Sequence, residues 1–382
     1  MGNQRDIPLY HKIREHLRMA ILSGQMPPDA PIPGEIELAR QYGVSRNTTR
    51  QAIMDLTREG ILQRTPHRGT FIVEGCNRAC NSNQVIRNRQ IGFITSVLND
   101  YFGSELTAAI DRASRELGYS LLVRVTERSY EVERQVINDM VNQGAAGIIS
   151  FPTVPPESNV YRELLSTGFP LVMVDCYLLD LDTAYVVSDN FGGAFKAVEH
   201  LVRLGHRRIS YIGGGISNVS SSIERYNGFR QALLVNDCPI PPCLLDLDIA
   251  KSGIDQVLSD VMIEKRIAEF LEESKPTAVF AQTDATAMVV MKAAKRCKIR
   301  IPNDVAIVGF DDMAVSAHLP CPLTTVRQDT AILGNTAVNL LHAMLTGKQL
   351  SGAEKVHVPV ELVVRESCGV HLHKRCKQVE AG

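Results

Sequence analysis

Apolar residues recur at helical spacing through the first sixty residues of the chain. Leu9, Ile13, Leu17 and Ile21 are four residues apart, so they form one face of an amphipathic helix. Two further segments carry apolar stripes, and each is bounded by a residue that favours a helix start and a glycine that favours its end. The predicted helices run from Leu9 to Ile21, from Pro33 toward Gly43, and from the N-cap Ser45 through residues 46–59 to Gly60.

A short hairpin is predicted directly after the third helix. Residues 61–64 and 70–73 have strand-like composition, and the turn between them contains Pro66 and Gly69. Three helices followed by a hairpin are typical of one DNA-binding architecture. We therefore predict a winged helix-turn-helix domain over residues 1–75.

Beyond residue 90 the pattern changes to short apolar runs that alternate with amphipathic segments. Continuous apolar strands between such helices predict an α/β domain whose parallel sheets are covered on both faces. Because the region 91–368 is long for one sheet, two linked lobes are favoured. The stretch 76–90 is polar and without clear period, so it is predicted to be a linker, and residues 369–382 are predicted to be a polar tail. The strand candidates are residues 91–97, 121–125, 146–150, 171–174, 209–212, 278–281 and 305–309, with a helix near 105–117.

Charge is distributed unevenly between these regions. Residues 1–90 hold 13 Lys and Arg against 8 Asp and Glu, whereas the whole chain holds 41 against 42. A basic amino-terminal domain on an acidic body is expected when one domain binds a nucleic acid and the other does not.

Composition also bears on the compartment. No run of 18 apolar residues exists, and charged residues interrupt the stretch that would form the core of a signal peptide. The nine cysteines are odd in number and lack the spacing of a disulfide framework, which favours free thiols in a reducing compartment. We expect a cytoplasmic protein with no membrane segment.

The third helix carries candidate DNA-reading groups on the side opposite its apolar stripe. Arg46, Asn47 and Arg50 lie together near its amino-terminal end, while Thr49 falls on the apolar side. An arginine can donate two hydrogen bonds to guanine, and an asparagine can bind adenine in the same two-bonded way. A solvated helix face is the alternative for these three residues considered alone.

The surrounding residues 7–74 resemble the DNA-binding domain of GntR-type regulators. The resemblance rests on residues 32–39, which look like the entry to the second helix, on 42–50, which look like the turn and recognition helix, and on 68–71, which look like the wing tip. Two departures affect individual contacts, since Gly34 replaces the usual Ser and His67 replaces the usual wing glycine. The resemblance implies DNA contacts from Glu35, Arg40, Arg46, Asn47, Thr48, Arg50, His67, Arg68 and Gly69.

The body resembles the effector domain of LacI/GalR-type regulators, which is similar to two-lobed periplasmic sugar-binding proteins. The matching pieces follow in order at residues 99–102, 188–193, 204–209, 225–229, 283–284, 308–312 and 322–326. A GntR-type domain on a LacI-type body is the combination found in bacterial arabinose repressors. The resemblance implies a small sugar effector, with a pentose such as L-arabinose favoured, and a homodimer that binds double-stranded operator DNA.

A sugar needs an aromatic face and planar polar groups that bind neighbouring hydroxyls. The residues that could supply them are Asn99, Tyr101, Phe102, Asp175, Asp189, Arg225, Asp284 and Asp311. Two alternatives stay open at this point. Asp189 is equally explained as a helix N-cap. Many LacI-type bodies have an arginine after the aspartate that Asp175 resembles, but this chain has Cys176 there, which argues against carrying over any particular set of hexose contacts.

Other chemistry finds little support in the sequence. Gly213 to Gly215 follow a predicted strand, but no phosphate-binding motif is completed and no nucleophile or metalloprotease motif is present, so no cofactor and no enzyme activity are expected. Cys368, His371, His373 and Cys376 are zinc-ligand types, although a solvated tail is the preferred interpretation. The function that we expect is a repressor. A sugar-responsive activator, or less favoured a sugar-binding enzyme or receptor, is the alternative.

Overall fold

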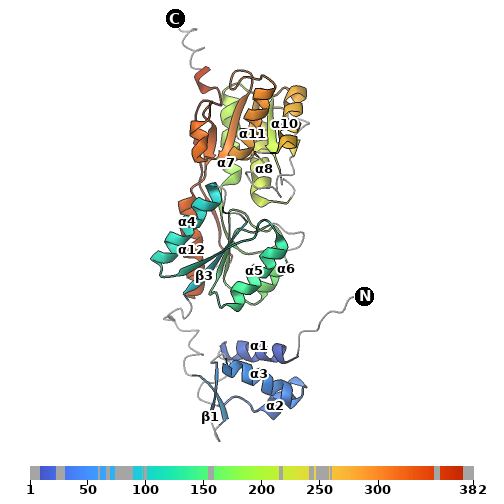
Figure 1. Cartoon of the computed structure of the whole chain (residues 1–382), viewed down its shortest axis with the longest axis vertical. Coiled ribbons are helices and arrows are strands. Elements are labelled where there is room, and N and C mark those ends of the chain that lie inside the picture. The colour runs from blue at the N-terminus through green and yellow to red at the C-terminus, as the bar shows by residue number, and fades with distance from the viewer. Residues whose placement is uncertain are drawn as a thin grey trace, which may run out of the picture. The chain divides into compact units, whose positions relative to one another are not determined.

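The structure is a computed structural model of the 382-residue chain (Figure 1). It divides into two compact units, Met1–Arg87 and Asn88–Gly382. The described residues are 9–22, 31–58, 61–65, 69–73, 89–96, 98, 101–153, 159–214, 218–240, 245–246, 258, 260–347 and 353–372.

The amino-terminal unit contains the predicted three helices and hairpin. The two strands are antiparallel and pair Leu62 with Ile72 and Thr65 with Gly69. The elements are α1 (Leu9–Leu22), α2 (Glu35–Tyr42), α3 (Arg46–Arg58), β1 (Leu62–Thr65) and β2 (Gly69–Ile72). Since all five elements appear in the expected order, the winged helix-turn-helix prediction is confirmed.

The helix boundaries of this unit have local causes. Gly43 ends α2 with a left-handed backbone (φ 63°), which glycine adopts without strain. Ser45 caps α3, because its Oγ accepts from the Thr48 amide at 3.3 Å. The apolar stripes of α1 and α3 meet in one core that includes Leu17 and Leu56, both fully buried.

The second unit contains two six-stranded sheets, which define two lobes. Lobe 1 holds the sheet β13-β7-β6-β5-β3-β4, and lobe 2 holds the sheet β14-β12-β11-β10-β8-β9. The strands of lobe 1 are β3 (Gln90–Thr95), β4 (Ser120–Val125), β5 (Ile148–Ser150), β6 (Leu171–Val174), β7 (Ala184–Ser188) and β13 (Lys355–Val358). Those of lobe 2 are β8 (Ile209–Gly213), β9 (Leu245–Asp246), β10 (Ala278–Ala281), β11 (Ala306–Asp311), β12 (Thr324–Arg327) and β14 (Glu361–Val363).

Helices cover both faces of each sheet, as the continuous apolar strands predict (Figure 1). In lobe 1, α5 and α6 pack on one face while α12 packs on β5, β6, β7 and α4. In lobe 2, α7 and α8 share one core with the sheet and α10 and α11 share the other. The helices are α4 (Tyr101–Glu116), α5 (Tyr130–Asn142), α6 (Asn159–Ser166), α7 (Asn190–Arg203), α8 (Ser220–Val235), α10 (Val261–Ser274), α11 (Asp284–Arg296) and α12 (Thr330–Leu345), with the 3-10 helix η2 (Ala314–His318).

The chain passes between the lobes three times. The passages follow β7, β12 and β13, since each of these strands is succeeded by an element that belongs to the other lobe. The lobes also touch through side chains, because the Tyr177 hydroxyl of lobe 1 donates to Oε1 of Glu224 on α8 at 2.9 Å. The prediction of two linked α/β lobes is thus confirmed.

Several details differ from the expectations. Strands β7, β9, β12, β13 and β14 had not been singled out, and β14 runs antiparallel to β12 at the edge of an otherwise parallel sheet. β3 begins at Gln90, inside the predicted linker, and most of that linker (residues 76–88) lies outside the described residues. The helix expected near 105–117 begins at Tyr101, so Tyr101 and Phe102 lie in its first turn.

The predicted tail begins inside the body rather than outside it. Val370 packs against the core of lobe 2, and Cys368 is fully buried with its Sγ 3.3 Å from Nε2 of His200. His373 and Cys376 lie outside the described residues. Within the described part of the chain no cluster of metal-ligating side chains is found, and no helix there is long and apolar enough to cross a bilayer.

Candidate functional site

The outer face of α3 presents the predicted DNA-reading groups to solvent. Arg46, Asn47 and Arg50 are all exposed, and Arg40 of α2 is exposed as well. Thr49 is fully buried and its Oγ1 donates to the Glu35 carbonyl at 2.9 Å, as expected for the apolar side. The helix therefore packs through its apolar side and presents two guanidiniums and an amide on its exposed side, where base edges can be reached.

Glu35 is placed to orient arginines. Its carboxylate lies 3.1 Å from Nε of Arg46 and 3.9 Å from Nη2 of Arg64 in β1, and its side chain is 15% exposed. Thr48 is tied to Ser45 through a 2.8 Å bond between their hydroxyl oxygens. Glu35 therefore connects the start of α2 with the start of α3 and with the first wing strand through polar contacts.

The wing carries the remaining predicted contacts. Gly69 begins β2 with φ 113°, a conformation that residues with a side chain rarely adopt, and it is exposed. His67 and Arg68 lie outside the described residues.

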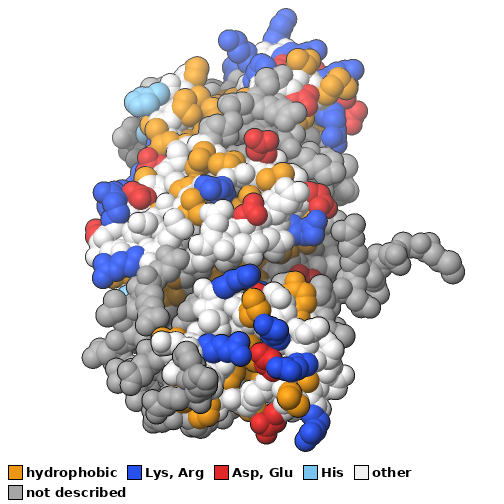
Figure 2. Space-filling view, turned by 60° about the horizontal axis from the view of Figure 1, so that its bottom comes forward, with side chains coloured by type: hydrophobic (Ala, Val, Ile, Leu, Met, Phe, Trp, Pro, Cys, Tyr) orange, Lys and Arg blue, Asp and Glu red, His pale blue; other side chains and the backbone are white. Residues whose placement is uncertain are grey.

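Figure 2 shows Lys and Arg side chains on the near face of the lower part of the molecule, with fewer acidic side chains among them.

A buried arginine forms the centre of the candidate effector site in the second unit. Arg225 on α8 is 5% exposed. Its Nε donates to Oδ1 of Asn190 at 2.8 Å, and its Nη1 donates to the Gln282 carbonyl at 2.8 Å. Nη1 also lies 3.4 Å from Oδ1 of Asp311, and the guanidinium carbon lies 3.8 Å from the centre of the Phe310 ring. Four different groups therefore fix the orientation of this guanidinium.

Asp311 ends β11 beside this arginine in a strained conformation. Its φ of 119° is rare for any residue except glycine, and such strain is concentrated at functional sites. Its carboxyl also accepts from Nε2 of Gln328 at 2.8 Å. Burial raises the pKa of Asp311 to about 8; Arg225 lowers that pKa, while the charges of Asp284 and Asp175 raise it. A carboxyl that titrates near neutral pH can both accept and donate hydrogen bonds.

Asp284 has a different environment, because its carboxylate accepts hydrogen bonds from groups of the protein through both oxygens. Oδ2 accepts from the Met313 amide at 2.9 Å and the Ser316 hydroxyl at 2.5 Å, and Oδ1 accepts from the Thr325 hydroxyl at 2.5 Å. A Cβ at Gly309 would lie 2.3 Å from Oδ1, so this close packing requires glycine there. Burial raises the pKa of Asp284 to about 6. A direct contact between Asp284 and a ligand stays a prediction. The three hydrogen bonds that its carboxylate already accepts from the chain argue against such a contact.

The two remaining predicted acids lie in lobe 1 and at its passage to lobe 2. Asp189 caps α7, since its Oδ1 accepts from the Gly192 amide at 2.8 Å, which is the alternative that the sequence left open. Asp175 follows β6 with φ 69°, again in the left-handed region. Its charge contributes to the raised pKa of Asp311 in lobe 2, after burial and the charge of Asp284.

The predicted aromatic residues start α4 directly after β3. The Phe102 ring meets Phe151 edge to face, with ring centres 6.5 Å apart. Tyr101 is 40% exposed and interacts electrostatically with Arg327 at the end of β12 in lobe 2. Asn99 lies outside the described residues.

Four residues of this cluster were not predicted from the sequence. Asn190, Gln282 and Gln328 follow strands of a sheet, and Phe310 lies within β11, where an apolar strand residue gives no functional signal. Residues that follow strands are candidates for ligand contact in open α/β folds, and that rule could have found the three polar ones.

The cluster leaves a hydrogen-bonding group open. Among the described residues, Oε1 of Gln328 is buried and has no hydrogen-bond partner. Together with the Arg225 guanidinium and the Asp311 carboxyl, it offers an acceptor, a donor and a carboxyl within one polar cluster. Such a set fits a ligand with several hydroxyl groups.

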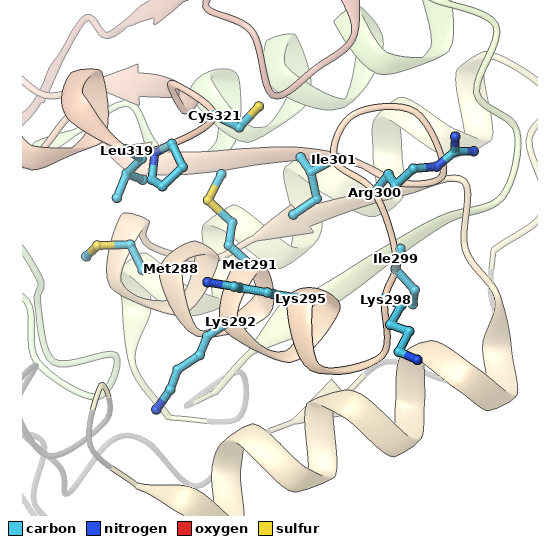
Figure 3. Close-up of a pocket in the computed structure, with 11 residues that line it drawn as sticks. Met288, Met291, Lys292, Lys295, Lys298, Ile299, Arg300, Ile301, Leu319 and Cys321 are labelled. Atoms are coloured by element: carbon cyan, nitrogen blue, oxygen red, sulfur yellow. The ribbon is translucent and has the colours of Figure 1, made fainter.

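A separate pocket lies on lobe 2 and involves none of the predicted effector residues. Its volume is about 520 Å³. Figure 3 shows Met291 in the middle of the group of lining residues, with Lys292 and Arg300 extending outward. The lining contains no carboxyl or amide side chain that could accept from a sugar hydroxyl. The residues are Met288, Met291, Lys292, Lys295, Lys298, Ile299, Arg300, Ile301, Leu319, Pro320 and Cys321.

Two parts of the chain match known protein families. Residues 9–72 match the bacterial regulatory proteins of the gntR family. Residues 198–368 match the periplasmic binding protein-like domain. These matches agree with the two resemblances that the sequence motifs indicate.

Curated relatives extend the similarity over nearly the whole chain. The arabinose metabolism transcriptional repressor of Geobacillus stearothermophilus is 28% identical over 368 residues, which cover 95% of this chain and 98% of that protein. The lactose operon repressor of Escherichia coli (strain K12) is 30% identical over 279 residues, covering 72% of this chain and 74% of that repressor. These relatives are transcriptional repressors and not enzymes, which confirms the expectation of a non-enzyme.

Solved structures show the same fold. The lac repressor dimer bound to operator and an anti-inducer is similar with a TM-score of 0.64 and 27% identity, over 74% of this chain and 94% of that one. The complex of the transcriptional regulator CelR with cellobiose is similar with a TM-score of 0.65 and 25% identity, over 88% of this chain and 99% of that one.

Proposed function

The chain belongs to the family of bacterial transcription regulators that includes the lactose operon repressor, and from that premise we propose that it represses transcription by binding operator DNA until a small sugar releases it. The similarity to an arabinose repressor over 95% of the chain is the observation that carries this proposal. Operator binding would place the protein in the cytoplasm, as its composition led us to expect.

The amino-terminal unit supplies the DNA-binding end. The exposed side chains of Arg46, Asn47 and Arg50 enter the major groove and contact base edges, while Glu35 holds Arg46 in place. His67, Arg68 and Gly69 of the wing contact the adjacent backbone or minor groove. A single domain of this size makes few base contacts, so the functional species is a homodimer that binds two half-sites.

The second unit supplies the effector site between the lobes. Arg225, Asp311 and Gln328 bind sugar hydroxyls, and Tyr101 or Phe102 lies against the C–H face of the ring. Because a relative that matches 95% of this chain is named for arabinose metabolism, L-arabinose is the favoured effector.

The test uses the full chain and duplex DNA. A preferred sequence is first selected from a random duplex pool, and its affinity is then measured at fixed salt with and without L-arabinose, D-ribose, D-xylose and D-glucose. We expect one pentose to weaken operator binding and the other sugars to leave it unchanged. Failure to select any sequence would refute the regulator, whereas a response to none of the sugars would refute the effector class tested.

A further inference from the structure

A buried carboxyl group in lobe 1 has no role in the site described so far. Glu133 on α5 is fully buried, in the apolar core that α5 and α6 form with the sheet. Burial of a carboxylate is unfavourable unless donors compensate it. Here the Tyr161 hydroxyl donates to Oε1, and the Thr153 amide donates to Oε2 at 2.8 Å. The second bond ties a core residue to a segment outside it.

That segment, residues 151–153, directly follows β5 and is held by several groups. The Phe151 amide donates to the Ile94 carbonyl of β3 at 2.8 Å. The Cys176 thiol donates to the Pro152 carbonyl at 3.7 Å. Thr153 has two anchors, because its amide donates to Glu133 and its Oγ1 lies 3.2 Å from Oγ1 of Thr126. Glu133 is the ionisable one of the two.

The same segment supports the effector site. The Phe151 ring meets Phe102 edge to face, and Cys176, which binds the Pro152 carbonyl, directly follows Asp175. Both Phe102 and Asp175 belong to the candidate site. Displacement of the segment would therefore move one aromatic and one acidic element of that site.

We propose that Glu133 is a positioning residue of the effector site, which fixes residues 151–153 by accepting the Thr153 amide and so holds Phe102 and Asp175 in their binding arrangement. The assignment rests on the proposed function. Glu133 does not contact the sugar, and its effect on affinity passes through the segment.

Three variants separate this role from general stability. Glu133→Met keeps the size and removes both acceptor oxygens, whereas Glu133→Gln keeps one acceptor oxygen for the Thr153 amide. Met140→Ala is the matched control, because Met140 lies on the same helix, is 1% exposed and packs against Gly92 of β3, and no hydrogen bond to residues 151–153 is lost with it. Should Glu133→Met not fold, Thr153→Pro removes the amide donor of the same bond, and Thr153→Val is its control because it keeps the amide and removes only the hydroxyl that contacts Thr126.

Each full-length variant is examined by calorimetry with L-arabinose and by hydrogen exchange of the peptide that covers residues 151–153. Glu133→Met should weaken L-arabinose binding at least about tenfold and speed exchange in this peptide. Glu133→Gln should stay within about threefold of the wild type, and Met140→Ala should lower the melting temperature with affinity within about twofold.

Unchanged affinity and exchange in Glu133→Met would overturn the assignment, as would an equal loss of affinity in Met140→Ala. The two proposals fail separately. If the wild type binds no L-arabinose, the sugar assignment fails, and the exchange rate of residues 151–153 in Glu133→Met alone decides the role of Glu133.

Discussion

Arg225 connects three parts of the second unit through one guanidinium. It bonds Asn190 at the start of α7, the carbonyl after β10 and Asp311 at the end of β11. Replacing Arg225 by Ala should weaken sugar binding at least about tenfold, or 1.4 kcal/mol, because ligand hydroxyls and Asp311 lose a charged donor. Titration calorimetry measures this loss. Arg230→Ala is the control on the same helix, since Arg230 is exposed. Wild-type affinity in Arg225→Ala would place the site elsewhere.

Glu133 makes stability depend on pH. Burial raises its pKa from the usual 4.5 to about 7, even though hydrogen bonds from Thr153 and Tyr161 lower it. Between these pH values the folded protein keeps a proton that the unfolded chain has released, so the free energy of unfolding falls as pH rises. The fall attributable to Glu133 is on the order of 3 kcal/mol and levels off above about pH 7.

Urea denaturation of the wild type and Glu133→Gln from pH 4.5 to 8 checks this dependence. The variant cannot titrate at this position, so its curve should be flatter. A slope remains in both proteins, since burial also raises the pKa values of Asp284 and Asp311. Parallel curves would show that Glu133 does not titrate as stated.

Among the secondary structure elements, α3 allows the most specific prediction about operator binding. Its exposed Arg50 lies on the face that holds Arg46 and Asn47. Arg50→Ala should cost about 1 to 3 kcal/mol of operator affinity and relax the preference at one base pair. Arg58→Ala is the control, because Arg58 is exposed in the last turn of the same helix and pairs only with Asp55 at 3.7 Å in the described contacts. Gel-shift titration against the selected sequence and single-base variants reads both effects. Equal preference in Arg50→Ala and the wild type would remove Arg50 from base readout.

Elements with a strong local pattern could be predicted, and those defined by distant pairing could not. The stripe of Ile13, Leu17 and Ile21 is buried as its spacing predicts. β13, in contrast, pairs with β7, which lies more than 150 positions earlier in the sequence. No local sequence pattern predicts this pairing. The same limit applies to the site. Arg225 was proposed as a site residue from a sequence motif. Gln328 becomes a candidate site residue only in the structure, where it follows β12 and donates to Asp311.

At the scale of the whole molecule, the proposed effector site includes residues at the passages between the lobes. Asn190 begins α7, at the far end of the passage that follows β7, and Gln328 lies in the passage that follows β12. Asn190 bonds Arg225 and Gln328 bonds Asp311. A sugar that binds this cluster therefore acts on two of the three segments about which the lobes would turn, which is where a change in lobe orientation must begin.

Such a change can release DNA only if the sugar prefers a body conformation in which the two DNA-binding domains of a dimer no longer match the half-sites. Linkage then requires reciprocity, because a sugar that weakens operator affinity by some factor has its own affinity weakened by the same factor in the presence of operator. We expect a factor of about 5 to 150. L-arabinose is titrated into the full-length protein by calorimetry, once alone and once with a saturating amount of the selected duplex, while a scrambled duplex serves as the control. The selected duplex should raise the dissociation constant of the sugar and the scrambled one should not. If both duplexes leave the constant unchanged for a sugar that binds, the second unit does not control DNA binding through equilibrium affinity, and the sugar-released repressor has to be abandoned even if both binding sites are real.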